Sequence, residues 1–165
     1  MKKIVLAGGC FWGVEAYYQR LKGVEKTRVG YANGKIPNPT YEQVKTGETN
    51  FVEAVEIYYD ENIISFRTIL EHLFRFIDPT SLNRQGGDIG TQYRTGIYYE
   101  DEKSHQEALK FIQEKQAEYD KPIVVEVKSL ENFYEAEEYH QKYLDKNPYG
   151  YCHVDLSLLK PWERK

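Results

Sequence analysis

The sequence is poor in cysteine, in long apolar runs and in excess positive charge, and each shortage excludes a class of protein. It contains only two cysteines in 165 residues, too few for the disulfide framework of a small secreted domain. No apolar run approaches the roughly 18 residues that a membrane-spanning helix needs. Lys and Arg total 22 against 26 Asp and Glu, so the net charge of −4 provides no basic excess for nucleic-acid phosphates. We therefore expect neither a membrane nor a nucleic-acid partner.

The composition is that of one folded domain. The 165 residues match the prior of roughly 150 per domain, and 41% of them are hydrophobic. Fifteen tyrosines and an aromatic fraction of 15% are far from a disordered composition. Without a linker, repeat or low-complexity stretch, the chain is expected to form a single domain over residues 1–165.

The first residues have some features of a secretory signal, because Lys2 and Lys3 precede an apolar stretch. That stretch runs only from Ile4 to Ala7, whereas a signal needs about 7–15 apolar residues. We therefore expect a buried strand that ends in a glycine turn, and a cytoplasmic protein.

In a reducing compartment the two cysteines can be inert core residues, metal ligands or redox groups. The two cysteines and four histidines show neither a C-x-x-C nor an H-x-x-x-H spacing. We therefore expect no metal site, which leaves a structural or a redox role.

Hydrophobic periodicity predicts an alternation of short strands and helices. Strands are predicted over residues 3–8, 25–31, 51–59, 95–99 and 123–129, and helices over residues 11–22, 65–77, 102–119 and 134–144. The order β-α-β-β-α-β-α-β-α predicts an α+β two-layer sandwich of split-βαβ type, followed by an aperiodic C-terminal tail. Residues 79–94 have no periodicity and three glycines, and structureless loops of that length are usually functional.

Cys10 lies between a glycine pair and the start of a predicted helix. A thiol at a helix N-terminus faces unpaired N–H groups and the positive end of the helix dipole, which favours the thiolate. Phe11 and Trp12 follow directly, and we expect both rings at the mouth of a site rather than under the apolar stripe of the helix. A buried structural cysteine with two core aromatic residues explains this pattern equally well.

Glu53 favours the reactive alternative. Strand alternation places five residues on one face, namely Phe51, Glu53, Val55, Ile57 and Tyr59. Glu53 is the only charged residue of this apolar face, and burial raises a carboxyl pKa, so the group can stay protonated and donate a proton. The alternative is that Glu53 is solvated at a frayed strand end or pairs with an arginine.

Several tyrosines lie in the aperiodic segments, among them Tyr41, Tyr93, Tyr149 and Tyr151. A phenol can hydrogen-bond a substrate oxygen without introducing charge, although any single tyrosine is more often a packing residue. Cys152 follows Tyr151 in a turn near the C-terminus, from which it could reach a distant partner, although a lone cysteine there is more often a bystander. We expect His140 and His153, in the same region, to be surface or packing residues.

Short motifs are spread from residue 9 to residue 152. The first is Gly9-Cys10-Phe11-Trp12-Gly13. Those that follow are Gly30-Tyr31, Asn38-Pro39-Thr40-Tyr41, Glu53-Ala54-Val55, Asp78-Pro79, Gln85-Gly86-Gly87-Asp88, Gly90-Thr91-Gln92-Tyr93-Arg94 and Asn147-Pro148-Tyr149-Gly150-Tyr151-Cys152. In content and order this set strongly resembles the peptide methionine sulfoxide reductase A family.

The resemblance implies reduction of the S epimer of methionine sulfoxide, free or in oxidised proteins and peptides, to methionine. By this likeness Cys10 attacks the sulfoxide sulfur and becomes a sulfenic acid. Glu53 would protonate the departing oxygen, while Tyr41 and Tyr93 hydrogen-bond it. Cys152 matches the family's resolving cysteine, which attacks the sulfenic acid to give a disulfide that thioredoxin or another dithiol reduces.

The likeness further implies an apolar pocket for the substrate methyl group, formed by Phe11 and Trp12, with Asp88 holding the site through its hydrogen bonds. It implies no metal and no organic cofactor, and a ferredoxin-like core with additional helices that agrees with the predicted element order. Phe51 stands where the family more usually has a histidine, so the surroundings of Glu53 differ. No cysteine follows Cys152, so recycling is expected to use two cysteines.

Two other functions fit parts of the pattern. A thiol peroxidase also uses a nucleophilic and a resolving cysteine, but it would need Thr or Arg beside the thiolate, and Cys10 is followed by aromatic residues. A ferredoxin-like RNA-binding module would stack bases on aromatic side chains. The negative net charge and the lack of a Lys/Arg-Gly-Phe-type strand motif disfavour that module.

Overall fold

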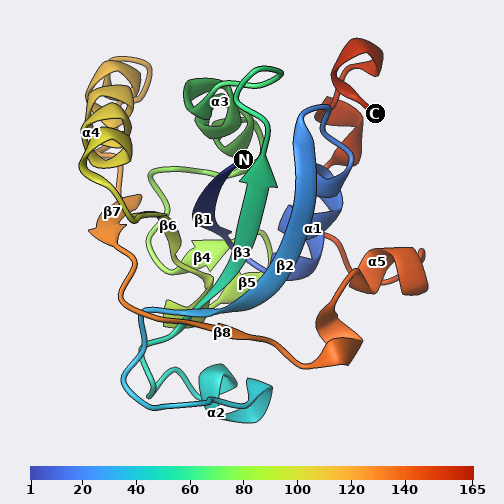
Figure 1. Ribbon diagram of the computed structural model, residues 1–165. Helices are drawn as coiled ribbons and strands as arrows, with labels where there is room; N and C mark the ends of the chain where they lie inside the picture. Colours follow the sequence, from blue (N-terminus) through green and yellow to red (C-terminus); the bar gives the residue numbers. More distant parts are fainter.

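Six strands form the main sheet in the order β7-β6-β1-β3-β2-β8 in the computed structural model, which describes residues 1–165 (Figure 1). Their bounds are β1 Lys2–Gly8, β2 Val24–Ala32, β3 Val52–Tyr59, β6 Thr95–Tyr99, β7 Glu126–Ser129 and β8 Phe133–Glu135. Neighbouring strands are antiparallel except for β6 and β7, which are parallel. A mixed sheet with helices makes the chain α+β, as the periodicity predicts.

Five α-helices accompany the sheet: α1 Phe11–Gln19, α2 Tyr41–Lys45, α3 Phe66–Phe76, α4 Glu102–Gln116 and α5 Tyr143–Lys146. Ser65 caps α3, because its hydroxyl accepts the Thr68 N–H. In Figure 1, α3 and α4 lie near one end of the strands and α2 lies near the other. None of these helices combines the length and the apolar character that crossing a membrane requires.

The main core lies between one face of the sheet and helices α1, α3 and α4. It is a cluster of 29 buried side chains, which includes Val55 and Ile57 of β3. A second cluster of six residues occupies the other face, and it includes Val52 and Ala54. Strand β3 therefore alternates between two buried faces, and Glu53 shares the face that the helices cover.

The predicted helix over residues 134–144 is wrong. Residues Phe133–Glu135 instead form β8 on the edge of β2, and a 3₁₀ turn at Glu138–His140 precedes the short α5. The Ala136 N–H extends the contact by donating to Val29 O. Pairing with a distant strand thus overrides the local helical pattern of this tyrosine-rich segment.

Two segments without periodicity contain short elements. Residues 79–94 hold a hairpin of β4 Arg84–Gln85 and β5 Asp88–Ile89, followed by a 3₁₀ helix at Thr91–Tyr93. Helix α2 begins with a capping box in which Thr40 and Gln43 exchange hydrogen bonds. This Thr-x-x-Gln spacing is a sequence signal for a helix start, but a helix of five residues is too short to show an apolar period.

Candidate active site

Cys10 lies in the sharp turn that joins β1, a central strand, to α1. Gly9 adopts φ +94°, and Cys10 occupies the N-cap position of the helix. A Cβ on Gly9 would lie 2.8 Å from Gln85 Cβ and 2.9 Å from His153 Nε2, so only glycine fits this turn. The turn buries Cys10 to 8% exposure at the edge of the core.

Glu53 of β3 lies beneath the start of α1, on the face that strand alternation predicts. Its Oε1 accepts the N–H of Phe11 at 3.2 Å, and the residue is 2% exposed. Burial raises the pKa of Glu53 to about 8; the Phe11 N–H opposes this rise, and the negative charge of Asp88 adds to it. At pH 7 the group is therefore mainly a neutral carboxylic acid.

The Cys10 thiol is also held in its neutral form. Burial raises its pKa well above the usual range, the neighbouring Glu53 raises it further, and only the Trp12 N–H opposes them appreciably. The backbone N–H at the helix start lowers the pKa of Cys10, as expected there, but desolvation raises it by more. The resting site thus pairs a thiol with a carboxylic acid.

Tyr41 and Tyr93 come from different elements, α2 and the 3₁₀ helix before β6, and both are half-buried. Burial raises the pKa of Tyr41 to about 12, and the charges of Glu53 and Cys10 raise it as well. The same influences raise the pKa of Tyr93 above its usual range. Both phenols are therefore neutral hydrogen-bond donors. Both lie near Glu53 and Cys10, whose ionised forms raise the phenol pKa values.

Asp88 of β5 connects the site to the C-terminal region. Its Oδ2 accepts the Tyr151 hydroxyl at 2.9 Å, and its charge raises the pKa values of both Glu53 and Cys10. Asp88 thus holds the chain one residue before Cys152.

Cys152 lies against the first turn of α1. Its thiol donates to Val154 O at 3.2 Å, and a Cβ on Gly13 would lie 3.2 Å from its sulfur. His153, next to it, donates from Nε2 to Gly8 O at 2.8 Å, so it binds the site turn rather than solvent. Both cysteines are free, and the fold brings them to the same end of α1 although 142 positions separate them in the sequence (152 − 10).

The two aromatic residues after Cys10 have different surroundings. Phe11 is 1% exposed and its ring packs 5.7 Å from that of Tyr31, so the expectation that it lies at the mouth is wrong. Trp12 is half-buried and stacks on Tyr143, with ring centroids 3.7 Å apart and an interplanar angle of 6°. Phe11 therefore packs in the core through its ring, while its backbone N–H binds the carboxyl of Glu53.

Sequence reasoning missed the role of His140. It is buried, and its Nδ1 accepts the Trp12 indole N–H at 2.9 Å. Its ring lies 5.1 Å from Phe11 and 4.6 Å from Tyr41. No local pattern marks this histidine, since its partners lie far along the chain and the segment around it was predicted to be helical.

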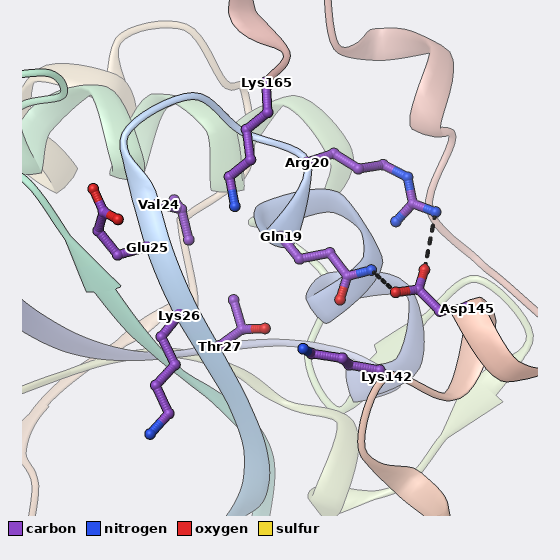
Figure 2. Close-up of a pocket in the computed structure, with 9 residues that line it drawn as sticks. All are labelled: Gln19, Arg20, Val24, Glu25, Lys26, Thr27, Lys142, Asp145 and Lys165. Atoms are coloured by element: carbon purple, nitrogen blue, oxygen red, sulfur yellow. Dashed lines mark hydrogen bonds and ion pairs between the residues drawn. The ribbon is translucent and has the colours of Figure 1, made fainter.

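A cavity of about 480 Å³ lies away from these residues (Figure 2). It is lined by Gln19, Arg20, Val24, Glu25, Lys26, Thr27, Lys142, Asp145 and Lys165. Asp145 accepts hydrogen bonds from both Gln19 and Arg20, as the dashed lines mark. None of the predicted site residues lines it, and no group of three His, Cys, Asp or Glu side chains is arranged to hold a metal ion.

A family model described as peptide methionine sulfoxide reductase matches residues 2–164. The chain belongs to this family. A peptide methionine sulfoxide reductase MsrA from Clostridium perfringens is 60% identical over 156 residues, which cover 94% of this chain and 99% of the relative. This reductase is therefore an oxidoreductase of the MsrA type.

Solved structures support the same assignment. Reduced Mxr1 from Saccharomyces cerevisiae matches this reductase with a TM-score of 0.86 and 39% identity, over 93% of this chain and 91% of that one. Methionine sulfoxide reductase A of Corynebacterium diphtheriae matches with a TM-score of 0.83 and 36% identity, over 92% and 77% of the two chains.

Proposed function

We propose that this reductase acts on the S epimer of methionine sulfoxide, free or in oxidised proteins, with Cys10 as nucleophile and Glu53 as the acid. The observation that carries the proposal is the neutral, buried pair that these residues form at the start of α1. A sulfoxide sulfur is a poor electrophile until its oxygen is protonated or hydrogen-bonded, and a carboxylic acid of pKa about 8 can supply that proton at neutral pH.

The chemical step transfers oxygen from the substrate to the enzyme. The Cys10 sulfur attacks the sulfoxide sulfur as Glu53 protonates the sulfoxide oxygen, and the thiol proton leaves to restore the acid. The oxygen then passes to the Cys10 sulfur, giving methionine and a cysteine sulfenic acid. Sulfur of the substrate is reduced by two electrons and sulfur of Cys10 is oxidised by two, so the step needs no further reactant.

The remaining site residues orient the substrate. Tyr41 and Tyr93 hydrogen-bond the sulfoxide oxygen as neutral phenols, a role supported by their position near the acid–thiol pair. Trp12 and, behind it, Phe11 provide the apolar surface for the methyl group. Asp88 holds the Tyr151 hydroxyl and thereby the approach to the second cysteine.

Recycling uses Cys152. Its sulfur attacks the sulfenic acid and expels water, which leaves a Cys10–Cys152 disulfide that thioredoxin or another dithiol reduces. Support comes from the place of Cys152 against the first turn of α1, and from Mxr1 of S. cerevisiae, which has been solved in complex with Trx2; that chain is 28% identical, with a TM-score of 0.60. The proposed route involves no metal and no organic cofactor, and it fits a cytoplasmic enzyme.

We also assign residues 1–165 to a single domain with a ferredoxin-like core and a long, mostly irregular C-terminal segment. The chain order β1-α1-β2-β3-α3-β6 and the sheet order β6-β1-β3-β2 support the core assignment, because they correspond to a split βαβ pair.

Reduction of racemic methionine sulfoxide by dithiothreitol, with products separated by chiral chromatography, tests the proposal. The wild type should consume only the S epimer, and Cys10→Ser should consume neither. Without added dithiol, Cys152→Ser should complete one turnover per enzyme, and with thioredoxin as the only reductant it should not cycle. Consumption of both epimers, or activity in Cys10→Ser, would contradict it.

A further inference from the structure

His140 lies at the centre of what we call the aromatic wall, formed by Phe11, Trp12, Tyr41 and Tyr139. The imidazole is 1% exposed, and its ring centroid lies 5.1 Å from Phe11, 4.6 Å from Tyr41 and 4.0 Å from Tyr139. Its strongest contact is the hydrogen bond of 2.9 Å from the Trp12 indole. One histidine thus contacts every ring of the wall.

The hydrogen bond determines the tautomer of His140. An indole N–H can only donate, so Nδ1 of the imidazole must accept and its proton must be on Nε2. Burial lowers the pKa of His140, while the charge of Glu137 opposes this, so the ring stays neutral at pH 7. Nδ1 is therefore available as an acceptor throughout the neutral range.

Packing alone does not account for a histidine at this position. Its Nε2 atom is buried and has no hydrogen-bond partner. A buried N–H without a partner destabilises the folded state, and a phenylalanine ring would fill the same space without that penalty. The property that phenylalanine lacks is an acceptor for the indole N–H.

Without that acceptor, the indole ring of Trp12 would not have a single defined orientation. Its stacking on Tyr143, at 3.7 Å and 6°, fixes the plane of the indole but permits sliding and rotation within that plane. The bond to His140 lies at the edge of the indole and restrains the in-plane rotation. The two contacts together fix the orientation of the indole ring.

We propose that His140 is a positioning residue, whose Nδ1 accepts the indole N–H and holds Trp12 where the methyl group of the sulfoxide packs. The inference rests on the proposed function, in which Trp12 forms the apolar surface of the substrate pocket. His140 takes no part in proton transfer.

Two substitutions separate the acceptor from the ring. His140→Phe keeps the ring and removes the acceptor, whereas His140→Asn removes the ring and retains an acceptor oxygen near the position of Nδ1. In single-turnover reduction of free methionine sulfoxide, we expect His140→Phe to raise the half-saturating concentration about 10-fold, as loss of one hydrogen bond implies. The maximal rate should change less than about 3-fold, and His140→Asn should recover part of the affinity.

The indole signals give a readout that does not depend on activity. The chain has two tryptophans, Trp12 and the exposed Trp162, so a ¹H–¹⁵N spectrum contains two indole peaks that Trp162→Phe assigns. The Trp12 indole proton should be shifted downfield and exchange slowly in the wild type and in His140→Asn, but not in His140→Phe. In wild-type protein labelled with ¹⁵N, a coupling between Trp12 Nε1 and His140 Nδ1 should be detectable, and this requires no variant to fold.

Several results would overturn the proposal. These are an absent coupling, an unchanged indole signal in His140→Phe, or equal losses of affinity in both His140 variants. Trp12→Ala separates the two claims, because an unchanged half-saturating concentration there would refute the role of Trp12 in the proposed function. If Trp12→Ala weakens binding and His140→Phe does not, only the role of His140 fails.

Discussion

The two cysteines of this reductase are held in different ways. Cys10 follows β1, which is hydrogen-bonded along both edges to β3 and β6 and lies over the main core. Cys152 belongs to residues 133–154, which we call the C-terminal segment. Its only strand is the three-residue β8, and its remaining elements are a 3₁₀ turn and the four-residue α5.

Side chains anchor the C-terminal segment to the rest of the fold. Glu15 of α1 accepts the Lys142 N–H at 2.6 Å and the Thr27 hydroxyl at 2.9 Å. The amide of Gln141 bonds both the N–H and the carbonyl of Val29, at 3.0 and 2.9 Å. Together with the edge pairing of β8 on β2, these bonds hold the segment, and it can open locally while β1, β3 and β6 stay paired. The nucleophile thus follows a strand that is paired on both edges, whereas its proposed disulfide partner lies in a segment with one short edge strand. We expect the second segment to open more easily, which suits a step in which the second sulfur must approach the first.

The largest effect on the reaction rate should come from Glu53, which lies in the sheet next to Cys10. Glu53→Gln removes the proton donor and keeps the shape, so the rate of single-turnover sulfoxide reduction should fall about 10²–10⁴-fold. Quenched-flow measurement of methionine formed per enzyme checks this. Glu56→Gln is the matched control, because Glu56 is equally buried in β3 but faces away from the site and pairs with Arg28 at 3.0 Å.

We expect Glu56→Gln to react within about 3-fold of the wild-type rate, because its ion pair contributes to stability and not to the proton transfer. Near-normal chemistry in Glu53→Gln, or an equal loss in Glu56→Gln, would show that the buried acid is not the proton donor.

A second effect of the same residue concerns stability. The Glu53 pKa is about 8 in the folded protein and about 4.3 in an unfolded chain, so the folded state binds the extra proton between these values. The stability that this proton gives is complete below pH about 4.3 and is lost as the pH rises through about 8. The free energy of unfolding of Glu53→Gln minus that of wild type should therefore be larger at pH 8.5 than at pH 5. The increase should be at least about 1.4 kcal/mol, the equivalent of one pKa unit. Urea unfolding at both pH values measures it, and a constant difference would contradict the raised pKa.

Sequence patterns could predict the placement of Cys10 and Glu53 better than that of the C-terminal segment. Alternation along residues 51–59 correctly placed Glu53 among apolar side chains, because strand periodicity is a local property. The position of Cys10 before a helix was equally local and is confirmed. The apolar face around Glu53 already indicates a neutral acid beside a neutral thiol, whereas the depth to which Cys10 is buried depends on the whole fold.

The C-terminal segment was predicted poorly because its contacts are distant in sequence. Its tyrosines and apolar residues recur at helical spacing, yet β8 pairs with β2 about 100 residues earlier. His140 is fixed by Trp12, Phe11 and Tyr41, none of which lies near it in the chain. Its turn near the C-terminus indicated that Cys152 could reach a distant partner and the motif resemblance gave it a role, but no pattern of spacing indicated that it lies beside α1.

The smallest effect should come from loosening the C-terminal segment at Glu15. Glu15→Ala leaves the Lys142 N–H and the Thr27 hydroxyl without their acceptor and should lower the free energy of unfolding by about 1 kcal/mol. Glu15→Gln retains an acceptor oxygen for Lys142 and should lose less. Hydrogen exchange should become faster in residues 140–152 of Glu15→Ala and stay unchanged in β1 and β3, since the sheet does not depend on this carboxylate. Faster exchange in residues 140–152, β1 and β3 alike would mean that the segment and these strands open together. The two cysteines would then not differ in how they are held.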